Sequence, residues 1–250
     1  MDIAQLSQQT GLPPHDMVKL PTEGVFYRNK KKSLKVGYLT AADENLLMGG
    51  DSTNSDGLIL SLLRTKIFES DIKVEELMDG DIQALLIFLR NTAFGPEYNF
   101  NLVDPETKKE FTSTILLDEL NIKRGNVLPN ENGIFETVLP KCGKNIKIKP
   151  LSIGEQNEIE KLALNYPVGR IPPKQTWRLN KMIVELDGIS DGGYISQEIE
   201  KLPIYDAKYI RKFIEENEPR LDLQKKVKAP SGKEVIVNIA FGVEFFRPFF

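Results

Sequence analysis

A turn that contains a proline, ends in a glycine and leads into a short alternating strand pattern recurs along this chain. Clear copies begin at Leu20-Pro21, Leu139-Pro140 and Ala229-Pro230, and a weaker one begins at Asp104-Pro105. Proline restricts φ and glycine accepts positive φ, so such a segment reverses the chain between two strands. The recurrence predicts a protein assembled from β-hairpins, with several surfaces to offer.

Alternating apolar residues flank these turns, as expected for half-buried strands. In the first hairpin, the strand Gly24–Tyr27 is expected to pair with Ser33–Leu39 across the basic turn Arg28–Lys32. The predicted hairpins cover residues 20–39, 98–120, 135–151 and 224–241.

Helical spacing of apolar residues appears between the hairpins. Helices are predicted over 58–68, 79–94, 174–186, 196–202 and 207–216, with one short turn of helix at 74–78. Two more are expected to begin with side-chain caps, at Thr40 with Asp43 and at Ser152 with Glu155, the second running to about Asn165. This alternation predicts the α+β class, with antiparallel β-hairpins alternating with short helices.

At 250 residues the chain can form one large domain or two modest ones. The glycine and two prolines within Gly11–Pro14 predict an N-terminal arm or short capped helix over residues 1–19. We expect a hairpin and helical unit over residues 20–97, and a boundary near 127–134 is the alternative to one near 95–100. A second hairpin and helix unit is expected over 98–250, ending in a phenylalanine-rich tail.

Composition excludes several classes of function. The net charge is −3, so no general attraction to nucleic acid is expected. The basic stretch Arg28–Lys35 is either a contact for an acidic partner or a solvated turn whose lysines discourage edge pairing, and the acidic total favours the second interpretation. Apolar runs are too short to cross a membrane, and Met1–Gln5 lacks the start of a signal peptide. We expect no membrane association and an intracellular location.

Reactive side chains are scarce. One histidine, His15, and one cysteine, Cys142, cannot form a catalytic triad, a cluster of His and Cys metal ligands or an internal disulfide. His15 lies beside two prolines and is expected to be exposed, while Cys142 is expected to be a plain turn residue. No glycine-rich phosphate loop occurs, and the acidic loop from Asp51 carries Leu62 where a calcium loop needs glutamate.

The sequence therefore predicts no catalytic residue, no metal, no cofactor and a protein that is not an enzyme. A hydrolase that uses paired carboxylates is the enzymatic alternative, and it would need two acids that converge in a pocket.

Aromatic side chains provide the candidate contact residues. Five of the last ten residues are phenylalanine, whereas chain ends are usually polar. Such a tail is either buried in its own domain or docked on another chain, because an exposed aromatic tail would form an apolar patch that promotes association. The candidate partner-binding residues are Phe241, Phe245, Phe246, Phe249, Phe250 and Tyr27.

The first turn also carries a family resemblance. Leu20–Tyr27 fits the pattern L-P-[ST]-x-G-x-x-Y, and Leu39–Asn45 fits [LM]-T-x-x-[DE]-E-[DN]. Together these segments resemble the start of the baseplate hub subunit and hub assembly proteins of T-even-type contractile-tailed bacteriophages. The match is clearest over residues 18–50 and weaker over the rest of the chain.

This resemblance implies a late viral protein that helps to build or form the hub of a tail baseplate through protein–protein contacts. Its partners would be other baseplate hub or tail proteins, with a homo-oligomer as a further alternative. It would act in the host cytoplasm during assembly, and either remain in the virion tail or leave. A transient tail-assembly chaperone for the hub or tape-measure protein is the alternative function.

Overall fold

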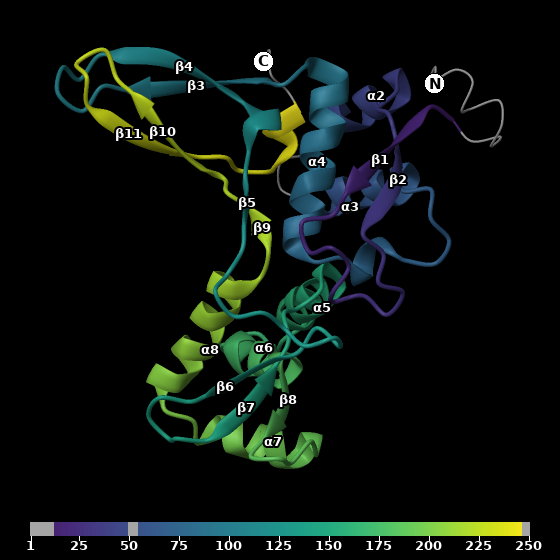
Figure 1. The fold of residues 1–250 in the computed structure, drawn as a ribbon, viewed down its shortest axis with the longest axis vertical. Helices are drawn as coiled ribbons and strands as arrows, with labels where there is room; N and C mark the ends of the chain where they lie inside the picture. Colours follow the sequence, from purple (N-terminus) through teal and green to yellow (C-terminus); the bar gives the residue numbers. More distant parts are fainter. Residues whose placement is uncertain (1–12, 50–54, 247–250) are drawn as a thin grey trace.

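The computed structural model describes residues 13–49 and 55–246, which form small antiparallel sheets and short helices (Figure 1). The α+β class is confirmed, with four two-stranded sheets and one three-stranded sheet in the described part of the chain. The strands are β1 His15–Lys19, β2 Ser33–Gly37, β3 Glu97–Val103, β4 Glu110–Leu116, β5 Ile122–Lys123, β6 Phe135–Val138, β7 Asn145–Ile148, β8 Ile183–Leu186, β9 Arg220–Leu221, β10 Gln224–Lys228 and β11 Glu234–Asn238. The helices are α2 Ala41–Gly49, α3 Ser55–Lys66, α4 Asp79–Phe94, α5 Ile153–Leu164, α6 Lys174–Met182, α7 Gly192–Glu200 and α8 Ile204–Asn217, with 3-10 turns η2 Val74–Glu76, η3 Leu117–Glu119 and η4 Val243–Phe246.

The first hairpin differs from the prediction. Strand β2 pairs with β1, so His15–Lys19 is a strand rather than part of an arm, and the predicted strand Gly24–Tyr27 is a series of turns. Glu23 and Gly24 have positive φ values of 51° and 76°, which no strand contains. Residues 1–12 of the predicted arm lie outside the described part of the chain.

His15 is buried, which contradicts its predicted exposure. Its ring nitrogen Nδ1 lies 2.8 Å from the Pro13 carbonyl, and its edge packs on the Phe68 ring at 5.8 Å. Pairing of β1 with β2 draws this residue under the sheet, an effect that local sequence does not reveal.

The β1–β2 hairpin, α2, α3 and α4 surround one apolar core. Its fully buried side chains include Leu34, Leu62, Leu85 and Leu89, which lie on facing sides of the hairpin and of α3 and α4. Helix α4 has the predicted bounds, and Thr40 and Asp43 cap α2 reciprocally: the Thr40 N–H donates to Asp43 and the Asp43 N–H to Thr40 Oγ1.

A second core lies between the β6–β7–β8 sheet and helices α6, α7 and α8. The predicted helix over 174–186 ends at Met182, because Ile183 pairs with Ile148 and continues as the third strand. β-Branched residues at this point favour the strand once an edge is available. The predicted capping box of Ser152 and Glu155 at the start of α5 is confirmed.

The two cores do not meet at the predicted boundary at residues 97 and 98, whereas the alternative boundary near 127–134 lies between Leu117 of the first core and Phe135 of the second. The first core takes residues 18–117 and then 227–246, whereas the second takes residues 135–214. The predicted unit 98–250 is therefore split, because β3–β4 and β10–β11 pack on the first core. We call residues 13–120 the first unit, 121–223 the second unit and 224–246 the returning segment.

Hairpins β3–β4 and β10–β11 lie together as an arm that projects from the first unit (Figure 1). The chain passes between the units twice, and the passing segments pair as β5 and β9. Two glycines hold this junction closely: a Cβ on Gly80 would lie 2.5 Å from the Pro219 carbonyl oxygen, and one on Gly154 would lie 2.7 Å from that of Glu75. Within the described residues no helix is long and apolar enough to cross a membrane.

Candidate interaction surfaces

Tyr27, predicted to bind a partner, lies inside the protein. Its hydroxyl donates to the buried carboxylate of Asp81 and accepts from the Met78 N–H at 3.0 Å. Burial, and then the charge of Asp81, raise the pKa of the Tyr27 hydroxyl far above its usual value. The side chain holds the first turn against α4, so its assignment to a contact surface is wrong.

The phenylalanine tail is also turned inward where it is described. Phe245 and Phe246 are buried in the first core, and Phe241 is partly buried against it. This agrees with burial in the protein's own domain and contradicts a role for Phe245 and Phe246 as free docking residues. Phe249 and Phe250 lie outside the described residues.

Arg90 fixes the base of the arm to α4. Its buried guanidinium donates to the carbonyls of Gly95 at 2.8 Å and Glu97 at 2.9 Å, and its carbon lies 4.9 Å from the Tyr98 ring centroid and 5.6 Å from that of Phe245. Burial lowers the pKa of Arg90. The sequence carries one signal of this role: a cation follows Leu89 on the apolar face of the predicted helix.

The arm is a two-layer stack of hairpins. Ile115 of β4 lies in the first core with Val227 and Val237 of the opposite hairpin, and Phe100 and Leu102 of β3 are partly buried against it. No further strand pairs with either hairpin among the described residues. The arm therefore presents open strand edges, a form that pairs with extended chains.

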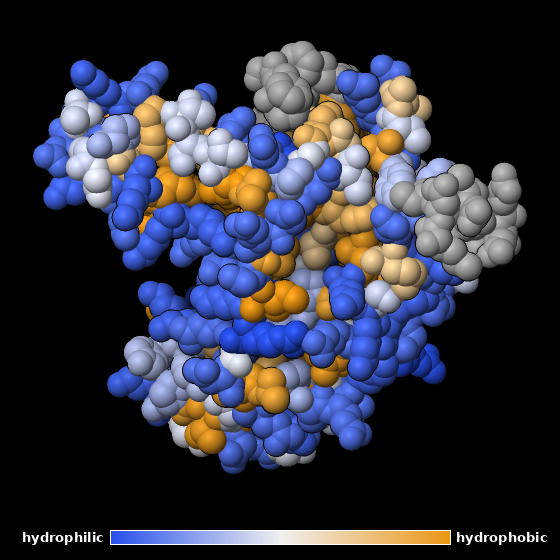
Figure 2. Space-filling model, turned by 45° about the horizontal axis from the view of Figure 1, so that its top comes forward, coloured by the Kyte–Doolittle hydropathy of each residue, from blue (hydrophilic) through white to orange (hydrophobic). Residues whose placement is uncertain are grey.

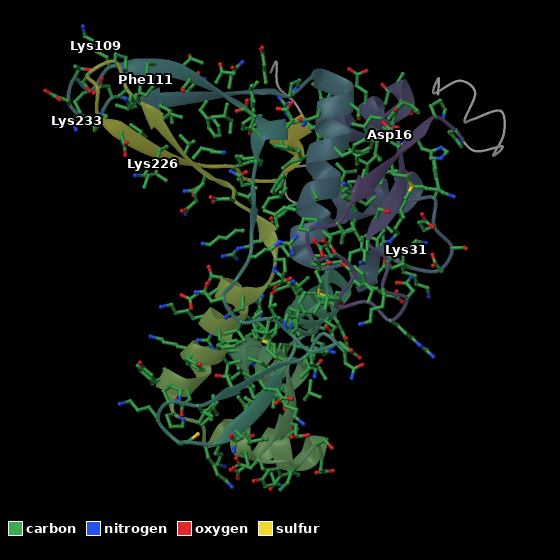
Figure 3. The ribbon with its side chains drawn as sticks, viewed as in Figure 1. Asp16, Lys31, Lys109, Phe111, Lys226 and Lys233 are labelled. Atoms are coloured by element: carbon green, nitrogen blue, oxygen red, sulfur yellow. The ribbon has the colours of Figure 1, made fainter. Side chains whose placement is uncertain are left out.

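Polar side chains occupy the middle of the outer face of β3–β4. Asn99 and Thr114 join across β3 and β4 at 2.7 Å, and Asn101 and Thr112 at 3.2 Å. Figure 2 shows hydrophilic side chains at the far end of the arm and an open hollow between the arm and the second unit. Lys109 and Lys233 lie at the tip (Figure 3).

Three buried aspartates anchor the proline turns. Each accepts the backbone N–H of the residue that follows the proline: Asp81 from Thr22 at 3.0 Å, Asp206 from Lys141 at 2.9 Å and Asp104 from Ser231 at 2.9 Å. Asp206 also accepts from the Cys142 N–H at 3.0 Å, and Asp104 from the Ser231 hydroxyl at 2.7 Å. The aspartates lie far from their turns in sequence, so local patterns could not reveal the pairing.

The connection between α5 and α6 carries the most exposed apolar side chains. Leu164, Val168 and Ile171 are at least 86% exposed, in a stretch interrupted by prolines. We call residues 164–171 the apolar loop. Aliphatic groups this exposed and this close together are typical of a contact made with another molecule.

The described residues hold no cluster of metal ligands, and their one thiol is not activated. No three or more His, Cys, Asp or Glu side chains are arranged there to hold a metal ion. Cys142 is partly buried in its turn, and burial raises the pKa of its thiol, which disfavours the reactive thiolate.

One carboxyl group at the junction is perturbed. Burial, and then the carboxylates of Asp79 and Asp81, raise the pKa of Glu218 to about 8, while Arg220 opposes them. One Glu218 carboxyl oxygen is buried without a hydrogen-bond partner. These acids lie where α4 meets the start of β9, and burial at this contact is the main cause of the shift.

Comparison with known proteins found no matching family model, no similar curated protein and no similar solved structure.

Proposed function

We propose that this protein is a non-enzymatic component of phage tail baseplate hub assembly, either as a structural subunit or as an assembly factor. It would act through protein–protein contacts with other baseplate hub or tail proteins. The resemblance of Leu20–Tyr27 and Leu39–Asn45 to hub proteins supports the setting. The two-hairpin arm, with open strand edges and a polar outer face, is the observation that carries the contact role.

The apolar loop supports the alternative of a transient tail-assembly chaperone for the hub or tape-measure protein. Val168 and Ile171 would rest on the client and be exposed again after its release. A chaperone leaves the particle, whereas a hub subunit stays. Mass spectrometry of purified virions separates the two: presence at the stoichiometry of hub proteins excludes the chaperone.

Co-expression with neighbouring genes of its genome tests the contact role. We expect a stable complex with at least one tail protein, which weakens when Asn101→Arg and Thr112→Arg place charge and bulk on the outer face of the arm. Val168→Asp with Ile171→Asp tests the apolar loop, with Arg170→Gln in the same loop as the matched control. Absence of any complex with all neighbouring tail proteins would contradict the proposal.

A further inference from the structure

The first hairpins of the two units have the same register. In each, the strand residue just before the turn pairs with the first residue of the return strand, and the pairing continues in step. The equivalent pairs are Lys19↔Ser33 with Val138↔Asn145, Val18↔Leu34 with Thr137↔Ile146, and Asp16↔Val36 with Phe135↔Ile148. Both turns begin with Leu-Pro, and in both the leucine N–H donates to a lysine carbonyl, Leu20 to Lys32 and Leu139 to Lys144, each at 2.9 Å.

The chain after each return strand is equivalent without a gap. Residues 34–45 read LKVGYLTAADEN and residues 146–157 read IKIKPLSIGEQN, so the apolar positions and the capping pairs coincide. Helix α2 follows the first stretch and α5 the second. The next helix also ends in the same way: Ile67 after α3 bridges to Val36, and Ile183 after α6 pairs with Ile148, the equivalent of Val36.

The anchoring helices match as well. Asp81 is the third residue of α4 and Asp206 the third of α8, and each is followed by buried aliphatic residues four and eight positions later. Each helix leads to a hairpin with proline at its tip, where the residue before proline bonds to a lysine carbonyl: Asp104 to Lys109 at 2.9 Å and Ala229 to Lys233 at 2.8 Å.

One difference explains why the second hairpin is not beside its own unit. On α4, Leu86 and Arg90 are buried and Arg90 contacts the base of the arm, whereas the equivalent α8 positions are Arg211 and Glu215, which are not buried. The α8 face is thus adapted to solvent, and the returning segment packs on the first unit instead. There it supplies Val227, Val237, Ile239, Phe245 and Phe246 to the first core.

We propose that the chain is a tandem duplication of one unit, and that a second copy of this chain can supply the returning segment to the first unit. The docking surface is the inner face of β3–β4 with α4, and its latch is the pair of bonds from Ser231 to Asp104. The second copy fits because the same segment already occupies this surface within one chain. The inference does not rest on the proposed function.

Exchange between copies follows from the connectivity. The first unit needs a segment that is separated from it by the whole second unit, so its core stays incomplete until that segment returns. In this interval the segment of a neighbouring molecule presents the same contacts, which is the situation that produces domain-swapped dimers. The exchanged segment begins just after β9, so the close contacts of Gly80 with Pro219 and Arg220 at the junction need not be broken.

Reciprocal charge variants of the full chain test the exchange. Asp104→Lys and Ser231→Asp each disrupt the latch, both within one variant molecule and between two copies of the same variant. In a swapped heterodimer of the two variants, one latch is the native Ser231–Asp104 pair and the other is a new Lys–Asp pair. We expect co-refolded mixtures to give a 1:1 heterodimer by light scattering, with a higher unfolding midpoint than either variant alone.

A mixture of Asp104→Lys with Thr112→Asp is the matched control, because it adds the same charge to the outer face of the arm without giving the introduced lysine an acidic partner at position 231. A single chain that carries both Asp104→Lys and Ser231→Asp shows, by its unfolding midpoint, whether the Lys–Asp pair is compatible with the fold. Wild-type copies with two different tags, refolded together, provide a measurement free of substitutions: recovery of both tags in one dimer supports exchange. Monomers alone in both experiments overturn the proposal.

Discussion

Asp206 shows how one buried side chain positions a distant turn. Its carboxylate accepts two backbone N–H groups of the turn at Lys141 and Cys142, and it is fully buried. Asp206→Ala leaves both partly buried donors without this partner, a cost of about 1–3 kcal/mol in the free energy of unfolding. Urea unfolding measures it, and Asp118→Ala at an exposed position is the control, with little expected effect. Equal stability of the two variants would contradict the anchoring role.

Glu218 predicts a pH dependence of stability. Its pKa is raised from 4.5 to about 8 in the folded protein, so between these values the native state binds more protons than the unfolded state. Its contribution is fully present below pH 4.5 and is lost as the pH rises through about 8. Glu218→Gln should therefore be more stable than wild type at pH 8, by up to about 4 kcal/mol in the free energy of urea unfolding, and the difference should vanish near pH 4. A constant difference across this range would contradict the shift.

The sequence predicts individual helices better than it predicts which distant segments pair. The 3.6-residue periodicity of 79–94 and the capping pairs at 40–43 and 152–155 are local signals, and they gave the right helices. The pairing of β1 with β2 and the strand β8 depend on contacts between distant segments. Tyr27 was misassigned for the same reason: its partner Asp81 lies on another element.

Gly80 tests the junction between the units at the level of elements. In a helix, Gly→Ala usually stabilises by up to about 1 kcal/mol, but here the new Cβ would lie 2.5 Å from the Pro219 carbonyl oxygen and 2.9 Å from the Arg220 Cα. We expect Gly80→Ala to destabilise by about 1–3 kcal/mol. Gly192→Ala, at the start of α7 with open space around it, is the control and should be neutral or stabilising. If Gly80→Ala and Gly192→Ala change the free energy of unfolding in the same direction, close packing at the junction is contradicted.

At the scale of the whole molecule, the chain is two similar units of which the first is completed by a segment that follows the second. The recurring turns made the α+β class predictable, and their similarity is the sequence trace of this repetition. Which hairpin packs on which core was not predictable, because Phe245 and Val227 would suit either apolar interior. The polar residues Arg211 and Glu215 on α8 are the feature that distinguishes the two.

Hydrogen exchange of the full chain in increasing, sub-denaturing urea tests this arrangement most directly. Backbone amides of β10 and β11 should lose protection together with those of β3, β4 and α4, in one cooperative step. Amides of β7, β8 and α8 should form a separate step. The arrangement is contradicted if amides of β10 and β11 lose protection together with those of β7, β8 and α8. It is also contradicted if they lose protection before both groups.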